Sequence, residues 1–108
     1  MANELTLVET MEAFQTLLKD NPRVVIDFYA DWCGPCKMIS PKFKELAGSY
    51  ASVTFAKVNV DDASDVSEEC GISAMPTFQF YKDGKKVAEM KGANETKLRE
   101  EVEKLANQ

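Results

Sequence analysis

The sequence contains no histidine, and this absence excludes several kinds of chemistry. A Cys-His nucleophile pair, an acid–base step at an imidazole and a Cys₂His₂ zinc site all need a residue that the chain lacks. The three cysteines are also too few for a Cys₄ zinc site within one chain. We therefore expect no metal site, and any cysteine chemistry has to come from the thiols themselves.

Long apolar runs and an excess of positive charge are missing as well. The apolar runs have the length of strands and are far too short to cross a membrane, so we expect no membrane partner. The net charge is −5, whereas nucleic-acid binding depends on clustered lysine and arginine. No glycine-rich phosphate loop or dinucleotide fingerprint occurs. We expect no nucleic-acid partner.

The cysteine count and the first residues bear on the compartment. Residues Met1 to Glu4 contain no basic segment followed by an apolar one, which is the pattern of a secretory signal. Three is an odd number of cysteines, whereas small secreted proteins usually carry an even number. Both features favour a reducing compartment, and we expect a cytoplasmic protein. A mature fragment cut from a longer precursor would show the same features.

The length and the order of the patterns predict one α/β domain over residues 1–108. The order is β-α-β-α-β-α-β-β-α, in which alternating strands and helices imply parallel neighbours with right-handed crossovers. The turn Asp83-Gly84 makes the last two strands a hairpin, which adds an antiparallel edge. A mixed sheet with helices on both faces follows.

Apolar periodicity and turn residues set the expected bounds of the elements. Thr10 and Asp62 are the expected N-caps of two helices. The expected strands cover residues 4–8, 24–29, 53–60, 77–82 and 86–90, and the expected helices lie between Met11 and Asn21, Met38 and Tyr50, Asp62 and Gly71, and around Leu98 to Ala106.

The most informative segment is Trp32-Cys33-Gly34-Pro35-Cys36-Lys37. It joins a buried strand to a helix, so Cys33 lies at the helix start, where unpaired N–H groups and the helix dipole favour a thiolate. Cys36 is one turn further on, so the two sulfurs share a helix face and can reach bonding distance. We expect Cys33, the outer thiol, to attack a substrate disulfide. Cys36, the deeper thiol, then resolves the mixed disulfide and closes a Cys33–Cys36 bond.

The residues between the two cysteines are expected to tune the redox potential. Gly34 and Pro35 set how easily the small ring closes and how strongly the thiolate is favoured.

A C-x-x-C pair can alternatively be half of a metal site or be incidental. Redox use is favoured here because the pair lies at a strand-to-helix junction and the chain offers neither a second pair nor a histidine.

Two charged residues interrupt apolar strands. Burial of Asp27, inside residues 24–29, would raise the pKa of its carboxyl, and we expect Asp27 to take the proton of Cys36. The alternative is an aspartate that faces outward at a strand irregularity. Lys57, inside residues 53–60, could pair with Asp27 if the two strands are adjacent. The alternative for Lys57 is an edge lysine with its ammonium in water.

The chain resembles the thioredoxin family along its whole length, and most of all the animal-type cytosolic members. The matching segments are Asp27-Phe28-Tyr29-Ala30, Trp32 to Lys37, Pro41, Lys57-Val58-Asn59-Val60-Asp61, Met75-Pro76-Thr77-Phe78 and Gly92. The resemblance implies a thioredoxin fold, in which a central five-stranded mixed sheet of order 1-3-2-4-5 is flanked by four helices.

The resemblance also implies a substrate site. It implies a cis peptide bond before Pro76, facing the active-site cysteines. It further implies that Trp32, Met75, Pro76 and the loop at Gly92 and Ala93 form an apolar groove for an extended substrate segment. Because Pro76 has no N–H, the backbone of Met75 is free to pair with that segment as a strand would.

The function that the resemblance implies is protein disulfide reduction. Reducing equivalents would come from NADPH through a flavin-dependent thioredoxin reductase, the clients would be proteins with disulfides, and the chain itself would bind no cofactor. We expect a monomer. A redox-gated module that holds partners only in the dithiol state is the alternative. An oxidase or isomerase is disfavoured because Pro35 stands where oxidising relatives carry histidine.

The third cysteine, Cys70, shares a helix side with Val66 and has Glu69 beside it, so we expect a buried structural thiol. Some animal-type members carry another cysteine just before the Met-Pro pair. In this chain that position is Ala74, which argues against dimerisation through a disulfide there.

Overall fold

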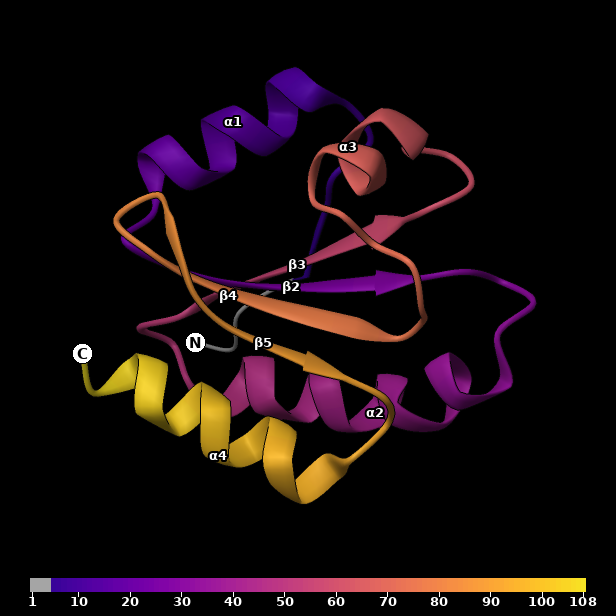
Figure 1. The fold of residues 1–108 in the computed structure, drawn as a ribbon. Helices are drawn as coiled ribbons and strands as arrows, with labels where there is room; N and C mark the ends of the chain where they lie inside the picture. Colours follow the sequence, from indigo (N-terminus) through magenta and orange to yellow (C-terminus); the bar gives the residue numbers. More distant parts are fainter. Residues whose placement is uncertain (1–4) are drawn as a thin grey trace.

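The computed structural model describes residues 5–108, which form a five-stranded sheet between two layers of helices (Figure 1). Helices α1 and α3 cover one face of the sheet, and α2 and α4 cover the other. The strands are β1 (Thr6–Leu7), β2 (Arg23–Tyr29), β3 (Thr54–Asn59), β4 (Thr77–Lys82) and β5 (Lys85–Lys91). The helices are α1 (Met11–Asp20), α2 (Gly34–Ser49), α3 (Ser64–Glu69) and α4 (Glu95–Ala106).

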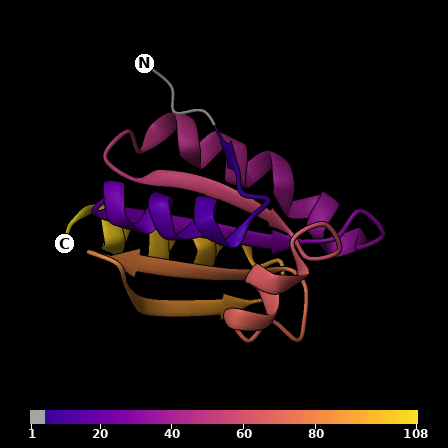
Figure 2. The same ribbon diagram turned by 90° about the horizontal axis from the view of Figure 1, so that it is seen from above.

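The order of the strands is β1-β3-β2-β4-β5, as the family resemblance implied. Strands β1, β3 and β2 run parallel, and β4 and β5 run antiparallel to their neighbours. Figure 2 shows β4 and β5 side by side. Asp83 and Gly84, with φ of 52° and 82°, turn the chain between them, as two-residue hairpin loops require. The predicted mixed sheet is therefore confirmed.

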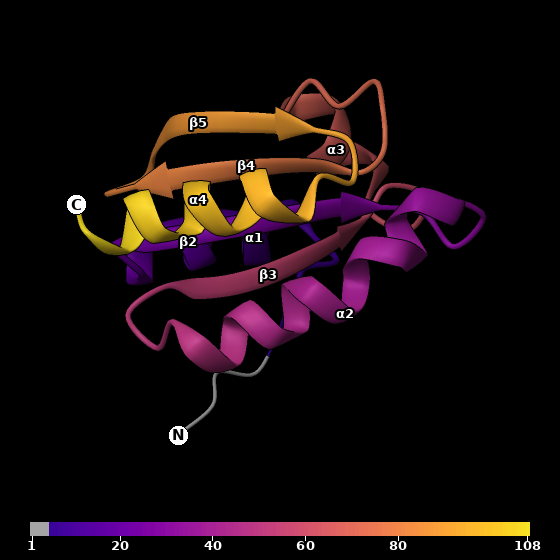
Figure 3. The same ribbon diagram turned by 90° about the horizontal axis from the view of Figure 1, so that it is seen from below.

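Strand β2 lies in the middle of the sheet, between β3 and β4 (Figure 3), and its side chains alternate between two cores. Val24, Ile26 and Phe28 belong to the core under α1 and α3, while Val25 belongs to the core under α2 and α4. Because side chains two residues apart in a strand share a face, Asp27 points the same way as Val25, toward α2. The register of β2 thus fixes the direction of the one acidic side chain in this strand.

One of the two predicted N-caps is confirmed and the other is wrong. The Thr10 hydroxyl accepts a hydrogen bond from the Ala13 N–H at 3.0 Å, so Thr10 caps α1. Asp62 does not cap α3, whose N-cap is Ala63 without a side-chain hydrogen bond. The Asp62 N–H instead donates to the side chain of Asn59 at 3.4 Å, within the turn that follows β3. Asp62 therefore still belongs to this turn, and the helix begins after it.

Several predicted bounds shift by a few residues. The predicted start of the first strand, Glu4, lies outside the described residues, and β1 covers only Thr6–Leu7. Helix α2 begins at Gly34, ahead of the apolar run from Met38, and so agrees with the expected position of Cys33 at the helix start. Its first turn therefore includes the residues between the two cysteines, which places Cys33 at the cap position itself.

Candidate active site

Cys33 is the N-cap of α2 and forms a disulfide with Cys36 one turn along the helix. Their Cα atoms are 5.3 Å apart, and the Cys36 N–H donates to Cys33 Sγ at 3.2 Å. Pro35 lies in the first turn, where a helix has no use for its missing N–H. An N–H donor at the sulfur and the positive end of the helix dipole both favour a Cys33 thiolate once the disulfide is reduced.

The two cysteines are equally buried, which corrects the expectation that Cys33 is the outer thiol. Cys33 is 5% exposed and Cys36 is 4% exposed. Both belong to a small buried cluster with Ala30, against which Met75 packs. The cysteines differ instead in their surroundings, because Cys33 Sγ accepts an N–H at the helix start whereas Cys36 lines a pocket that also contains Asp27.

Asp27 is buried, with 1% of its surface exposed, and faces this pocket of about 170 Å³ together with Cys36 and Ser40. Burial raises the pKa of the Asp27 carboxyl to about 7, while the positive charge of Lys57 opposes part of this rise. Asp27 Oδ1 has no hydrogen-bond partner among residues 5–108. The alternative of an outward-facing aspartate is therefore wrong.

Lys57 is an internal residue of the sheet rather than an edge lysine. In β3 it is aligned with Leu7 of β1 on one side and with Asp27 of β2 on the other. Its Nζ lies 4.5 Å from the centroid of the Tyr29 ring. Within the described part of the chain no ion pair of 4.0 Å or less joins Lys57 to Asp27, so the two share a pocket without the direct pair considered above.

Two loops come together beside the cysteines. The Met75–Pro76 peptide bond is cis, as the resemblance implied, and Met75 packs against the cysteine cluster. The Gly92 N–H donates to the Pro76 carbonyl oxygen at 2.9 Å, and Gly92 has a φ of 95°, which favours glycine. Ala93 follows Gly92 and is exposed. Met75, Pro76 and Gly92 are thus brought together, with Met75 packed against the cysteine cluster.

Trp32 precedes the cysteines and is 69% exposed. Its indole Nε1–H donates to Asp61 Oδ2 at 3.0 Å, in the loop after β3. This hydrogen bond orients the ring while most of its apolar surface stays in solvent. Gly34 and Pro35 are also exposed, so the surface around the disulfide is accessible although both cysteines are buried residues.

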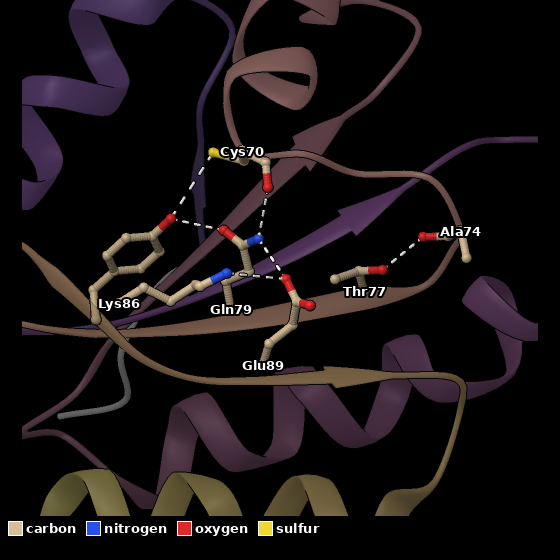
Figure 4. A network of polar contacts seen from close by, with 7 residues as sticks. Cys70, Ala74, Thr77, Gln79, Lys86 and Glu89 are labelled. Atoms are coloured by element: carbon tan, nitrogen blue, oxygen red, sulfur yellow. Dashed lines mark hydrogen bonds and ion pairs between the residues drawn. The ribbon is translucent and has the colours of Figure 1, made fainter.

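Cys70 follows α3 and is half-buried in a polar network (Figure 4). Its Sγ lies 3.9 Å from Tyr81 Oη, and the Tyr81 hydroxyl donates to Gln79 Oε1 at 2.7 Å. Gln79 Nε2 donates to the Cys70 carbonyl oxygen and to Glu89 Oε2, as Figure 4 shows. Burial raises the pKa of the Cys70 thiol. Cys70 is therefore partly buried in a polar network, rather than fully buried as the sequence predicted.

One residue of the pocket, Tyr29, has no role that follows from the sequence alone. The available signal was its spacing, because a residue two positions after Asp27 in the same strand has to share its face. The contact with Lys57 depends on the register of β2 against β3, which the sequence does not reveal.

Other kinds of site are not found in the described residues. Among residues 5–108, no three or more acidic, histidine or cysteine side chains are grouped where they could hold a metal ion. None of the helices in this range is both long enough and apolar enough to cross a bilayer.

Comparison with known proteins identifies relatives over nearly the whole chain. The thioredoxin family model matches residues 5–104. Mouse thioredoxin is 50% identical over 102 residues, which cover 93% of this chain and 97% of the mouse protein. Chicken thioredoxin is 55% identical over 82 residues, or 76% of this chain and 78% of the chicken protein. The oxidised form of mitochondrial thioredoxin 3 from Saccharomyces cerevisiae matches with a TM-score of 0.91 at 42% identity, covering 94% of this chain and 95% of the yeast chain.

Burial of Asp27 makes stability depend on pH in a defined direction. Its pKa rises from 3.8 to about 7 on folding, so ionisation above about pH 4 destabilises the folded state, and the loss is complete above about pH 7. At about 1.4 kcal/mol per pH unit, Asp27→Asn should raise the free energy of unfolding by a few kcal/mol at about pH 8.5 and change it little at about pH 4. Urea denaturation of the oxidised protein measures both values. Asp20→Asn, at an exposed carboxylate of α1, is the control, and an equal gain at both pH values would contradict the prediction.

The environments of Cys33 and Cys70 predict unequal reactivity in the reduced protein. Cys33 has the helix start and the Cys36 N–H, whereas burial raises the pKa of Cys70. Iodoacetamide at about pH 7 should modify Cys33 at least about tenfold faster than Cys70, because the thiolate is the reactive form. Peptide mass spectrometry gives the two rates, and the difference should vanish in urea. Equal rates in the folded protein would show that the helix start does not activate Cys33.

Proposed function

Because the chain belongs to the thioredoxin family of thiol–disulfide oxidoreductases, we propose that it reduces protein disulfides with Cys33 as the attacking thiol and Cys36 as the resolving thiol. The observation that carries this assignment is the Cys33–Cys36 disulfide at the start of α2, with the Cys36 N–H directed at Cys33 Sγ. The donor and the helix dipole act on Cys33, so this sulfur is the better candidate for a stable thiolate.

The proposed reaction consists of two thiol–disulfide exchanges. The Cys33 thiolate attacks one sulfur of the substrate disulfide, the substrate S–S bond breaks, and the other substrate sulfur leaves as a thiolate. Cys36 then loses its proton and attacks Cys33 Sγ, which releases the second substrate sulfur and forms the Cys33–Cys36 bond. The substrate gains two electrons and, after protonation, two protons, while the protein loses the same number.

In this reaction Asp27 is the proposed acceptor of the Cys36 proton. Both side chains line the same pocket, and its volume of about 170 Å³ leaves room for water between them. A carboxyl whose pKa is about 7 is well suited to take and return a proton near neutral pH. Lys57 is proposed to set the charge in the pocket, because its positive charge opposes part of the rise that burial causes in the pKa of Asp27.

The surface around the disulfide is the proposed substrate site. Trp32, Met75, Pro76, Gly92 and Ala93 would contact an extended substrate segment, and the Met75 backbone would pair with it as a strand does. The packing of Met75 on the cysteine cluster and the Gly92–Pro76 hydrogen bond support this placement. Gly34 and Pro35, exposed in the first turn of α2, would tune the redox potential.

The partners follow from the family in general terms. Thioredoxins act with thioredoxin reductase and with disulfide substrates, and they need no bound cofactor. For this chain we propose a monomer in the cytoplasm that takes reducing equivalents from NADPH through thioredoxin reductase. The similarity to mouse and human thioredoxins supports this proposal.

The proposed division of labour between the cysteines predicts different defects for the two variants. With NADPH, thioredoxin reductase and a generic protein disulfide, the unaltered protein should turn over many times. Cys36→Ser should lose turnover but accumulate mixed disulfides through Cys33, because the resolving thiol is gone. Cys33→Ser should lose both, and Cys70→Ser is the matched control that retains turnover. Non-reducing electrophoresis detects the adducts.

Two results would argue against the reductase. A folded, unaltered protein without turnover in this assay would overturn the proposal. The redox-gated binding module would be the better description if two results were found together. Cys36→Ser would bind partners without covalent adducts, and the unaltered protein would bind them only in its dithiol state.

The role of Asp27 predicts a change in the titration of Cys36. The pH profile of Cys36 alkylation in the unaltered protein should show a step near pH 7, where Asp27 ionises, followed by a second step for the thiol. Asp27→Asn should remove the first step and slow the resolution of a mixed disulfide at least about tenfold at neutral pH. Ser40→Ala, which changes a neutral side chain of the same pocket, should leave the profile unaltered. An unchanged profile in Asp27→Asn would remove Asp27 from the mechanism.

A further inference from the structure

The Lys57 ammonium rests on an aromatic ring rather than on the buried carboxylate next to it. Lys57 Nζ lies 4.5 Å from the centroid of Tyr29, which is inside the range of about 6 Å for a cation–π contact. Tyr29 is two residues after Asp27 in β2, so both side chains stand on the face that meets α2. All three residues line one pocket.

The register of the sheet gives Lys57 a different partner within reach. Lys57 in β3 is aligned directly with Asp27 in β2, and neighbouring strands are about 4.8 Å apart. A flexible lysine side chain starting there could bring its ammonium to the carboxylate, where an opposite charge would strongly favour the ionised acid. In the described part of the chain this ion pair is not formed, and Asp27 Oδ1 has no hydrogen-bond partner there.

The other groups around the pocket do not explain this arrangement. Asp31, which follows β2, and Lys37 of α2 line it but are exposed to solvent. Cys36 and Ser40 of α2 are the remaining lining side chains with polar atoms, and Cys36 is held in the disulfide. On the opposite strand, β4, the residue aligned with Asp27 is the uncharged Phe78. Lys57 is therefore the cation whose position decides the charge balance at Asp27.

We propose that Tyr29 is a positioning residue, whose ring holds the Lys57 ammonium away from the Asp27 carboxylate. The functional meaning of this inference rests on the proposed role of Asp27 as acceptor of the Cys36 proton. A carboxylate paired with an ammonium is a weak base, whereas the same carboxylate with its cation held on a ring accepts a proton more readily. Tyr29 would then act on the reaction through Lys57, while its side chain also packs against the buried cluster of Ala30, Cys33 and Cys36.

The titration of Asp27 tests this inference directly. The carboxyl ¹³C shift of Asp27, followed against pH in the oxidised protein, reports its pKa without interference from the thiols of Cys33 and Cys36. Tyr29→Leu should release Lys57 toward Asp27 and lower the midpoint of the Asp27 titration by about one pH unit. This shift corresponds to an acid dissociation constant about tenfold larger. Tyr29→Phe keeps the ring, so it should leave the midpoint where it is in the unaltered protein.

The Tyr29 ring could affect Asp27 either by positioning the Lys57 ammonium or by excluding water. The same substitutions in a Lys57→Met background separate these two effects. Without the ammonium, Tyr29→Leu should leave the Asp27 midpoint unchanged. An equal fall of the Asp27 midpoint with and without Lys57 would show that the ring merely keeps water out, and it would overturn the proposal. An unchanged midpoint on Tyr29→Leu in the protein that retains Lys57 would also overturn it. Tyr29→Met serves as the second ring-free variant if Tyr29→Leu does not fold.

These outcomes are distinct from those that test the role of Asp27 as base. The alkylation profile of Cys36 in Asp27→Asn decides whether the carboxyl serves the thiol at all. The ¹³C titration decides whether Tyr29 controls the charge next to that carboxyl. If the alkylation profile does not respond while the titration midpoint falls as expected, the electrostatic link from Tyr29 through Lys57 to Asp27 stands and only its catalytic use fails.

Discussion

The hydrogen bond from the Cys36 N–H to Cys33 Sγ is the contact on which the rest of the site depends. It exists because β2 ends at Tyr29 and α2 begins at Gly34, so that Cys33 falls on the cap position between them. An ordinary N-cap uses a side-chain oxygen to satisfy a free N–H of the first turn. Here a sulfur occupies that place, and the stabilisation that would cap a helix stabilises a thiolate instead.

The buried carboxyl of Asp27 is a cost that the surrounding fold has to offset. Its pKa rises from 3.8 to about 7 on folding, which at about 1.4 kcal/mol per pH unit corresponds to a few kcal/mol of lost stability once the group is ionised. The large apolar cores on the two faces of the sheet make such a cost tolerable, since β2 is buried from Val24 to Phe28. A group that destabilises the fold and lines a pocket with a reactive cysteine fits a functional role better than a structural one.

Residue patterns predicted most features that depend on neighbours along the chain, and the family resemblance implied the strand order, but contacts between particular side chains of distant segments were missed. The cap at Thr10 and the turn at Asp83 and Gly84 are local, and both are confirmed. The predicted cap at Asp62 is also local but is wrong, because the Asp62 N–H donates to the Asn59 side chain within the turn that precedes α3. The burial of Asp27 could be predicted from its apolar neighbours. The contact of Lys57 with the Tyr29 ring could not, because it depends on the parallel register of β2 and β3.

The equal burial of the two cysteines changes what can set their order of reaction. If exposure does not distinguish Cys33 at 5% from Cys36 at 4%, the difference has to lie in what stabilises or accepts charge near each sulfur. Cys33 faces an N–H and the start of a helix, which act permanently on its anion. Cys36 faces a pocket whose carboxyl changes its own charge near neutral pH. One sulfur is thus stabilised as an anion by the fixed backbone, while the ionisation of the other is coupled to a group that titrates.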